Sequence, residues 1–241
     1  YANGVVYEGD FRNAMHHGQG TMTSPGGYIY EGPWVNGVKE GDGQITYPDG
    51  AIYTGSLADG ERQVLDIFLP GQIIGLREIG FTRSLSNIMV LTDAVACPFP
   101  KSRLTEIFEQ SPRLSALFFL ALAQEEAILI ERIVNVSRRP AAQRLAHFIV
   151  ELKLRLHLDA DDFELPMNQT IIGDTLGLTA VHVSRTLKVL RDDNLVSIED
   201  GIVHIENLDA LIKYAGFNPA YLGDEAQWSR FAKLPVATAP G

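Results

Sequence analysis

Residues 165–191 read LPMNQTIIGDTLGLTAVHVSRTLKVLR, and they carry the clearest structural signal in the chain. Asn168 precedes an apolar run with helical periodicity and can cap a short helix. Gly177 can turn the chain sharply without steric cost, and Thr179 can then cap a second helix. Two helices joined by a short turn that contains glycine form a helix-turn-helix, so we predict this motif here.

The second helix of this motif carries a basic face. Between Thr179 and Arg191 the sequence contains three cations and no anion. The N-terminal residues of such a helix contact base edges in the major groove of DNA. Residues 195–205 follow as two alternating runs around Asp200-Gly201, and this pattern predicts a β-hairpin wing.

This stretch resembles the winged helix of the Crp/Fnr family of bacterial transcription regulators. The likeness lies in the wing and in residues 177–185, which read GLTAVHVSR. The resemblance implies a sequence-specific DNA-binding regulator with residues 179–191 as its recognition helix. It also implies three partners, which are double-stranded DNA, a second copy of the chain in a homodimer, and RNA polymerase. The alternative is a two-helix corner of an ordinary domain.

The resemblance also implies roles for individual side chains. Arg185 can pair bidentately with guanine, and Ser184 can donate to or accept from either base type. Val181 stands where family members usually carry a glutamate that reads cytosine, and it offers only apolar contact, for example to a thymine methyl. We therefore expect a half-site different from the family's usual one. The candidate phosphate contacts, which orient the protein rather than specify sequence, are Asn168, Thr170, Thr179, His182 and Lys188.

The first sixty residues repeat with a period of 23. Tyr-Glu-Gly occurs at 7–9 and 30–32, and Tyr-Thr-Gly at 53–55. Aromatic or β-branched residues alternate with polar ones, and glycine clusters mark turns, so we predict one β-hairpin per repeat and a single elongated sheet. The pattern is similar to the MORN repeat, which implies a scaffold for a protein partner.

We expect neither membrane nor metal binding from these repeats. Residues 1–60 contain only Arg12 and Lys39 as cations among several acids, so an anionic lipid surface would repel them. His16 and His17 are adjacent, and neighbouring residues of a strand point to opposite faces of the sheet.

The composition is that of an ordinary globular protein. The chain has 241 residues, 46% hydrophobic and 21% charged, with a net charge of −10. No run of about 18 apolar residues occurs, so we expect no membrane span. The one cysteine, Cys97, excludes a disulfide framework and a four-cysteine iron–sulfur cluster, favours a cytoplasmic location, and is expected to be buried. We expect no bound cofactor.

Residues 61–110 resemble the second half of the cyclic-nucleotide-type β-roll that precedes a long helix in Crp/Fnr proteins, while the first half is absent. Short apolar runs predict strands here, at 73–75, 88–91 and 94–99. Arg83-Ser84 falls where the family binds an effector phosphate. Leu76 stands where a ribose-binding acid is expected, so we interpret Arg83 as a solvated loop cation rather than as part of a nucleotide site.

Ser111-Pro112 is expected to begin a long helix that ends near residue 137. Its apolar face is too wide for the surface of a monomer, and its charged residues are expected on the other faces: Glu125, Glu126, Glu131 and Arg132. In the family this helix pairs with its twin as a coiled coil, which implies the homodimer. The alternative is a helix buried within a lone chain.

These elements predict an α+β fold. Its parts are expected to be hairpin repeats over 1–60, a partial β-roll over 61–110, a dimerisation helix over 111–137, a winged helix over 138–217 and a mobile tail over 218–241.

No nucleophile–base pair, phosphate loop or metal cluster occurs at a convincing spacing, so we expect no enzyme. The leading hypothesis is a homodimeric transcription regulator whose sensory half is replaced by the repeats. One alternative is a protein-interaction scaffold in which the repeats act beside a vestigial winged helix. The other is that the join is a recombination or assembly product without a selected function.

Overall fold

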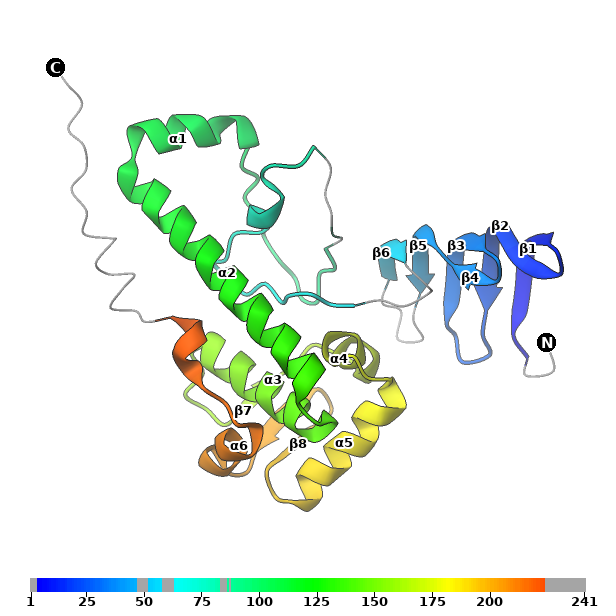
Figure 1. Ribbon diagram of the computed structural model, residues 1–241. Helices are drawn as coiled ribbons and strands as arrows, with labels where there is room; N and C mark the ends of the chain where they lie inside the picture. Colours follow the sequence, from blue (N-terminus) through cyan, green and yellow to red (C-terminus); the bar gives the residue numbers. More distant parts are fainter. Residues whose placement is uncertain (1–3, 47–51, 58–62, 83–85, 87, 224–241) are drawn as a thin grey trace. The chain divides into compact units, whose positions relative to one another are not determined.

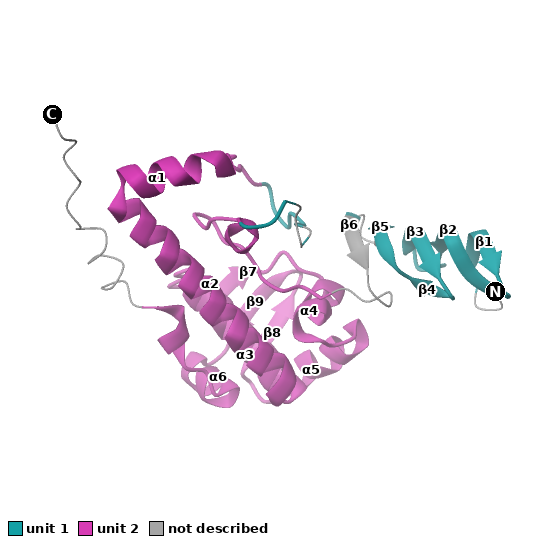
Figure 2. Cartoon of the chain, turned by 45° about the horizontal axis from the view of Figure 1, so that its top comes forward, with its two compact units in different colours: residues 1–62, 80–93 teal, residues 63–79, 94–241 magenta. Residues whose placement is uncertain are grey.

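A computed structural model of the chain describes residues 4–46, 52–57, 63–82, 86 and 88–223 (Figure 1). The chain divides into two compact units, which are coloured separately in Figure 2. The first unit comprises residues 1–62 and 80–93, and the second comprises residues 63–79 and 94–241.

In the first unit the described residues between 6 and 57 form a six-stranded antiparallel sheet. The strand order is β1-β2-β3-β5-β6, and β4 pairs with β3 alone. The strands are β1 Val6–Arg12, β2 Met15–Thr23, β3 Ile29–Val35, β4 Val38–Lys39, β5 Gly41–Thr46 and β6 Ile52–Leu57. The prediction of successive hairpins in one sheet is confirmed for these residues.

Glycines of neighbouring strands lie opposite one another in this sheet, as Gly20 and Gly32 do. The rings of the repeated tyrosines occupy the space that these glycines leave: a Cβ added at Gly43 would lie 2.6 Å from Cε2 of Tyr30. Tyr30 is fully buried, and its hydroxyl donates to the carbonyl of Pro33 at 2.8 Å. The close approach of the ring therefore requires glycine at position 43.

We expect Gly43→Ala to lower the free energy of unfolding of the repeat sheet by about 1–3 kcal/mol, because the added methyl overpacks a filled space. Gly26→Ala is the matched control, since a Cβ at Gly26 meets nothing within 4 Å and φ is not positive there. Denaturant titration of the full chain, followed by the fluorescence of Trp34 in a Trp228→Phe background, measures both. Equal midpoints for the two variants would contradict this packing.

The second unit is largely helical (Figure 1). Its helices are α1 Leu104–Gln110, α2 Pro112–Arg138, α3 Ala141–Arg155, α4 Gln169–Leu176, α5 Ala180–Asp192 and α6 Leu208–Ala215, with 3-10 turns η1 Leu76–Glu78, η2 Lys101–Arg103 and η3 Pro219–Leu222. Its described strands, β7 Asp162–Glu164, β8 Val196–Glu199 and β9 Ile202–Ile205, form an antiparallel sheet in the order β7-β9-β8. The predicted α+β class is confirmed.

The core of this unit lies around α3. Leu145 and Ile149 of α3 are fully buried, as are Val183 and Leu190 of α5. The predicted wing is the hairpin β8–β9, and its turn at Asp200-Gly201 has φ values of 50° and 80°. Positive φ at both central residues is the type I′ turn that matches the twist of the strands.

The strands predicted at 73–75, 88–91 and 94–99 are wrong. Among the described residues from 63 to 100 there is no strand, and the regular element is η1. A strand needs hydrogen-bonding partners at its edges, and neither of the described sheets includes a strand that pairs with these segments. The turn η2 and helix α1 at 101–110 were not predicted either, and Cys97 is exposed rather than buried.

Helix α2 begins where predicted, with the Ser111 side chain accepting a hydrogen bond from Leu114 N. The prediction that all its charged residues avoid the packed face is wrong for Glu125 and Arg132, which are buried. Both are buried against opposite charges: Arg77 Nε lies 3.5 Å from Glu125 Oε2, and Arg132 Nη2 lies 3.2 Å from Glu151 Oε1.

Residues 218–223 pack on the helices instead of trailing away. The Tyr221 hydroxyl donates to Glu151 Oε2 at 2.8 Å, and Gln124 Nε2 donates to the Leu222 carbonyl at 2.6 Å. Burial and the neighbouring Glu151 carboxylate raise the pKa of Tyr221, so this hydroxyl keeps its proton. The remainder of the predicted tail, residues 224–241, lies outside the described residues.

Candidate nucleic-acid interface

Helices α4 and α5 form the predicted helix-turn-helix, and both predicted caps are present. The Asn168 side chain accepts from Ile171 N at 2.9 Å, and the Thr179 hydroxyl accepts from His182 N at 3.2 Å. Gly177 ends α4 with φ of 65°, the left-handed conformation that glycine adopts without strain. These caps fix where the second helix starts, and so which of its residues lie at its N-terminal end.

The close packing of the two helices depends on Gly173, which sequence reasoning missed. Leu178 N donates to the Gly173 carbonyl at 2.9 Å. A Cβ on Gly173 would collide with the Leu178 carbonyl oxygen. The sequence shows a glycine inside a helical pattern, but its role in packing against the turn depends on how the turn folds.

The face of α5 that carries the candidate base contacts is open to solvent. Val181 is 62% exposed, and Ser184 and Arg185 are also exposed. Val183 and Leu190 point into the core. Figure 1 shows α5 at the outer edge of its unit, so one side of the helix is available to a partner.

The cations of this face are not neutralised within the unit. In the described part of the chain neither Arg185 nor Lys188 has an ion-pair partner, and both are exposed. The helix contributes no acid before Asp192. The exposed face is therefore positive even though the chain as a whole is acidic.

An open hollow of about 410 Å³ lies beside this face. It is lined by Ala141, Ala142, Thr179, Val181, His182, Arg185, Thr186 and Val189. The lining mixes small and apolar side chains from the start of α3 with the candidate contact residues of α5.

The candidate phosphate contacts other than Lys188 gather at two helix N-termini. Asn168 and Thr170 lie at the start of α4, whereas Thr179 and His182 lie at the start of α5. Helix N-termini present unpaired N–H groups and favour anions. The candidate effector pair, Arg83 and Ser84, lies outside the described residues.

Two family models match this chain. The model for a Crp-like helix-turn-helix domain matches residues 143–214, and the MORN repeat model matches residues 7–27 and 30–52. Residues 143–214 are a Crp-like helix-turn-helix domain. The sheet of the first unit is built from MORN repeats.

Curated relatives agree with this assignment. The Transcriptional activator protein anr of Pseudomonas aeruginosa is 30% identical over 160 residues, which is 65% of this chain and 66% of that protein. The Anaerobic regulatory protein of Haemophilus influenzae is 30% identical over 162 residues, 66% of this chain and 63% of that protein. The matches thus span less than two thirds of these relatives.

A solved structure shares the fold. A transcriptional regulator of the CRP family from Thermus thermophilus aligns with a TM-score of 0.50 at 17% identity, covering 88% of this chain and 97% of that one. None of the described helices of the present chain is both long and apolar enough to cross a lipid bilayer.

A buried histidine lies where α2 meets the Crp-like domain. His147 of α3 is 1% exposed, and its Nε2 lies 3.1 Å from Glu131 Oε1 of α2. The same carboxylate oxygen lies 2.7 Å from Arg139 Nη2. Burial lowers the pKa of His147 to about 4, and the nearby Arg139 and Arg132 contribute to that shift against the opposing effect of Glu131. Phe217 and Tyr221 cover the ring.

This histidine should make the domain sensitive to acid. The unfolded state binds a proton at about pH 6.5 and the folded state at about pH 4, so stability is lost as pH falls between these values. We expect a loss of about 1.4 kcal/mol per pH unit from this group, or roughly 3 kcal/mol in all. Denaturant titrations of the protein and of His147→Phe from pH 7 to 4 measure the difference.

The matched control for this prediction is His157→Asn, because His157 is exposed and asparagine tolerates its positive φ of 52°. It should keep the full acid dependence. If His147→Phe loses stability with falling pH as steeply as His157→Asn, the buried histidine is not the source.

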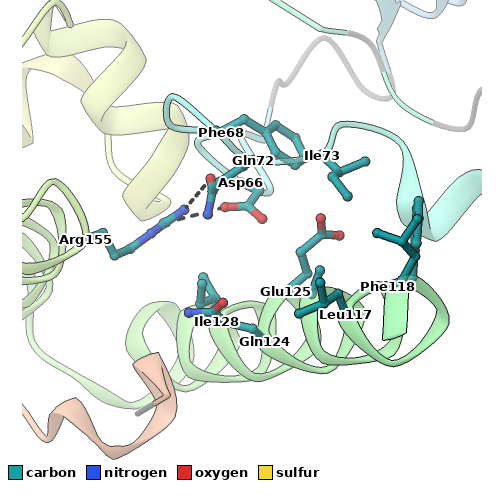
Figure 3. A pocket seen from close by; sticks show the side chains of 13 residues that line it. Asp66, Phe68, Gln72, Ile73, Leu117, Phe118, Gln124, Glu125, Ile128 and Arg155 are labelled. Carbon is teal, nitrogen blue, oxygen red and sulfur yellow. Dashed lines mark hydrogen bonds and ion pairs between the residues drawn. The ribbon is translucent and has the colours of Figure 1, made fainter. Parts of the chain in front are cut away.

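A cavity of about 360 Å³ lies between residues 66–73 and α2 (Figure 3). In Figure 3 the carboxylates of Asp66 and Glu125 both project into it. Arg77 Nη2 lies 2.7 Å from Asp66 Oδ2, and Arg155 Nη1 lies 3.7 Å from Asp66 Oδ1. Burial raises the pKa of Glu125, and Arg77 opposes that shift. The ion pairs fasten residues 63–79 to α2 and to the Crp-like domain.

Proposed function

We propose that this protein is a sequence-specific DNA-binding transcription regulator of the Crp/Fnr type that acts as a homodimer. The observation that carries the proposal is the exposed face of α5, which is free of acids from Ala180 to Arg191 and lies within a Crp-like helix-turn-helix domain. A helix placed in this way enters the major groove, where base pairs present distinct donors and acceptors.

Three exposed residues of α5 are proposed to contact bases. Arg185 reads guanine through a bidentate contact, Ser184 adds an adaptable hydrogen bond, and Val181 offers an apolar contact to a thymine methyl. The residues at the two helix N-termini and Lys188 hold phosphates and set the orientation of the domain. Val181 cannot accept a hydrogen bond from cytosine. We therefore propose that this protein reads a half-site in which position 181 does not recognise a cytosine.

The outer face of α2 supports the proposed dimerisation. The inner face is packed against the unit through Ile128 and its buried neighbours, whereas the outer face stays exposed. Apart from Leu114, the large exposed apolar residues on α2 share one face of the helix, as the seam of a coiled coil requires, and are Phe119, Leu122, Ile130, Ile133 and Val134. A paired α2 would place two copies of α5 at half-sites about 34 Å apart.

The remaining parts are assigned as follows. We propose residues 1–60 as repeats that contact a protein partner, 61–110 as a remnant of the ligand-binding roll, 111–137 as the dimerisation helix, 138–217 as the DNA-binding domain and 218–241 as a tail. RNA polymerase is the proposed partner at the promoter, and a regulator of bacterial promoters acts in the cytoplasm. No catalytic step is part of the proposal.

The salt dependence of binding tests the proposed interface. The logarithm of the binding constant of the full chain for a mixed-sequence duplex should fall linearly with the logarithm of the salt concentration. The reason is that binding releases counterions from the DNA phosphates. Lys188→Ala should reduce that slope by about one and weaken binding to all sequences alike. The control is Lys213→Ala, which removes an exposed cation of α6. An unchanged slope for Lys188→Ala, or an equal change in the control, argues against this interface.

A further inference from the structure

Arg144 of α3 lies outside the helix-turn-helix but binds the ends of two other helices. Its Nε donates to the carbonyl of Arg139 at 2.7 Å, and its Nη1 donates to the carbonyl of Leu176 at 3.2 Å. Arg139 is the residue that caps the C-terminus of α2, and Leu176 is the last residue of α4. One guanidinium thus joins the end of the proposed dimerisation helix to the turn before the recognition helix.

Both of these carbonyls lie at C-terminal helix ends, where acceptors lack partners within the helix. A C-terminal end also carries partial negative charge, so a cation is favoured there. Arg144 is half-buried, and in the described part of the chain no carboxylate pairs with it. The planar fork of an arginine holds two acceptors in a fixed geometry, which the single ammonium of lysine does not do.

The backbone of Arg144 also forms hydrogen bonds, one of them to α2. Asn135 of α2 is buried, and its Nδ2 donates to the Arg144 carbonyl at 3.2 Å. Arg144 N donates to the Pro140 carbonyl at 2.9 Å in the first turn of α3. Hydrogen bonds made by Arg144 alone therefore connect α2 to the turn of the helix-turn-helix.

The internal shape of the helix-turn-helix does not depend on this contact. Leu178 N bonds the Gly173 carbonyl within the turn, and the buried Leu176, Val183 and Leu190 hold the helices through apolar contacts. What Arg144 adds to the apolar packing on α3 is a direct side-chain link from the end of α4 to the end of α2. Its loss should change where the recognition helix lies relative to α2, and leave its contact surface intact.

We infer that Arg144 is a positioning residue that sets the orientation of each recognition helix relative to its twin in the dimer. The inference rests on the proposed function. Loss of this positioning should affect the binding of two DNA ligands differently. A palindrome needs both recognition helices placed correctly, whereas a single half-site engages only one and does not report their relative placement.

The experiment compares the affinities of the full chain and of Arg144→Met for two duplexes: the palindrome that the unchanged protein selects from random DNA, and the same duplex with one half-site scrambled. We expect Arg144→Met to lose about tenfold or more on the palindrome. Its affinity for the single half-site should stay within about threefold, and Arg144→Lys should recover part of the loss because it can reach one carbonyl. Lys213→Met is the control, with both affinities unchanged.

Equal losses on the two duplexes would show that Arg144 only maintains the fold, and this would overturn the inference, as would no loss on either duplex. If Arg144→Met does not fold, Arg144→Lys makes the same comparison with a smaller expected difference between the two duplexes. Failure of the unchanged protein to select any palindrome rejects the proposed function itself, and the inference with it.

Discussion

Replacing both Ile130 and Ile133 with glutamate should convert the protein to a monomer and lower its affinity for a palindromic site by about a hundredfold or more. These two side chains are 54% and 56% exposed on the outer face of α2. In a paired helix they would be buried against their twins, and four carboxylates there would repel one another without compensating partners. Sedimentation equilibrium gives the mass, and a titration with the selected palindrome gives the affinity.

The matched control is Ile74→Glu, because Ile74 is also an exposed isoleucine but lies outside α2. It should leave both the mass and the affinity unchanged. The affinity of the double variant for a single half-site should also be nearly unchanged, since α5 is not altered. A double variant that still sediments as a dimer would place the interface elsewhere on the chain.

The second large effect is expected at Arg185. Arg185→Ala should reduce the free energy of specific binding by about 1–3 kcal/mol, roughly 5- to 150-fold in affinity. The reason is that alanine has no side-chain donors to replace the bidentate contact to guanine. Arg185→Lys should recover little of this, since an ammonium does not offer the paired donors of the guanidinium. The measurement is a titration with the selected palindrome and with a mixed-sequence duplex at one salt concentration.

The comparison of the two duplexes separates reading of sequence from attraction to phosphate. Arg185→Ala should lose much more on the palindrome than on the mixed sequence, whereas Lys188→Ala should lose similarly on both. If Arg185→Ala weakens both duplexes equally, Arg185 contributes charge only, and base reading must be sought elsewhere on α5.

Local sequence patterns were sufficient to predict the elements that carry the proposed function. Asn168 and Thr179 cap the helices at which they were predicted, and Gly177 adopts the left-handed conformation that the turn needs. The repeats were equally readable, because a period of 23 residues fixes one hairpin after another. Caps, turns and periodicity each act within a few residues, so the sequence reports them directly.

The parts that could not be predicted depend on partners distant in sequence. Strands were expected at 73–75 and 94–99 because their residues suit strands, but a strand forms only when another strand is present to pair with it. Arg132 was expected at the surface because the sequence does not reveal that Glu151 would face it. The contact of Arg144 with Leu176 spans 32 residues and was invisible for the same reason.

Sequence selection from random duplex DNA shows whether α5 reads a DNA sequence. The purified full chain and Arg185→Ala would be carried through the selection in parallel at about 0.15 M salt, where specific and nonspecific binding separate. We expect the unchanged protein to recover a palindrome whose half-sites lie about one helical turn, or roughly 34 Å, apart, and Arg185→Ala not to recover it. No enrichment, or the same enrichment by both proteins, would contradict sequence reading by α5 and leave the repeats as the functional part of the chain.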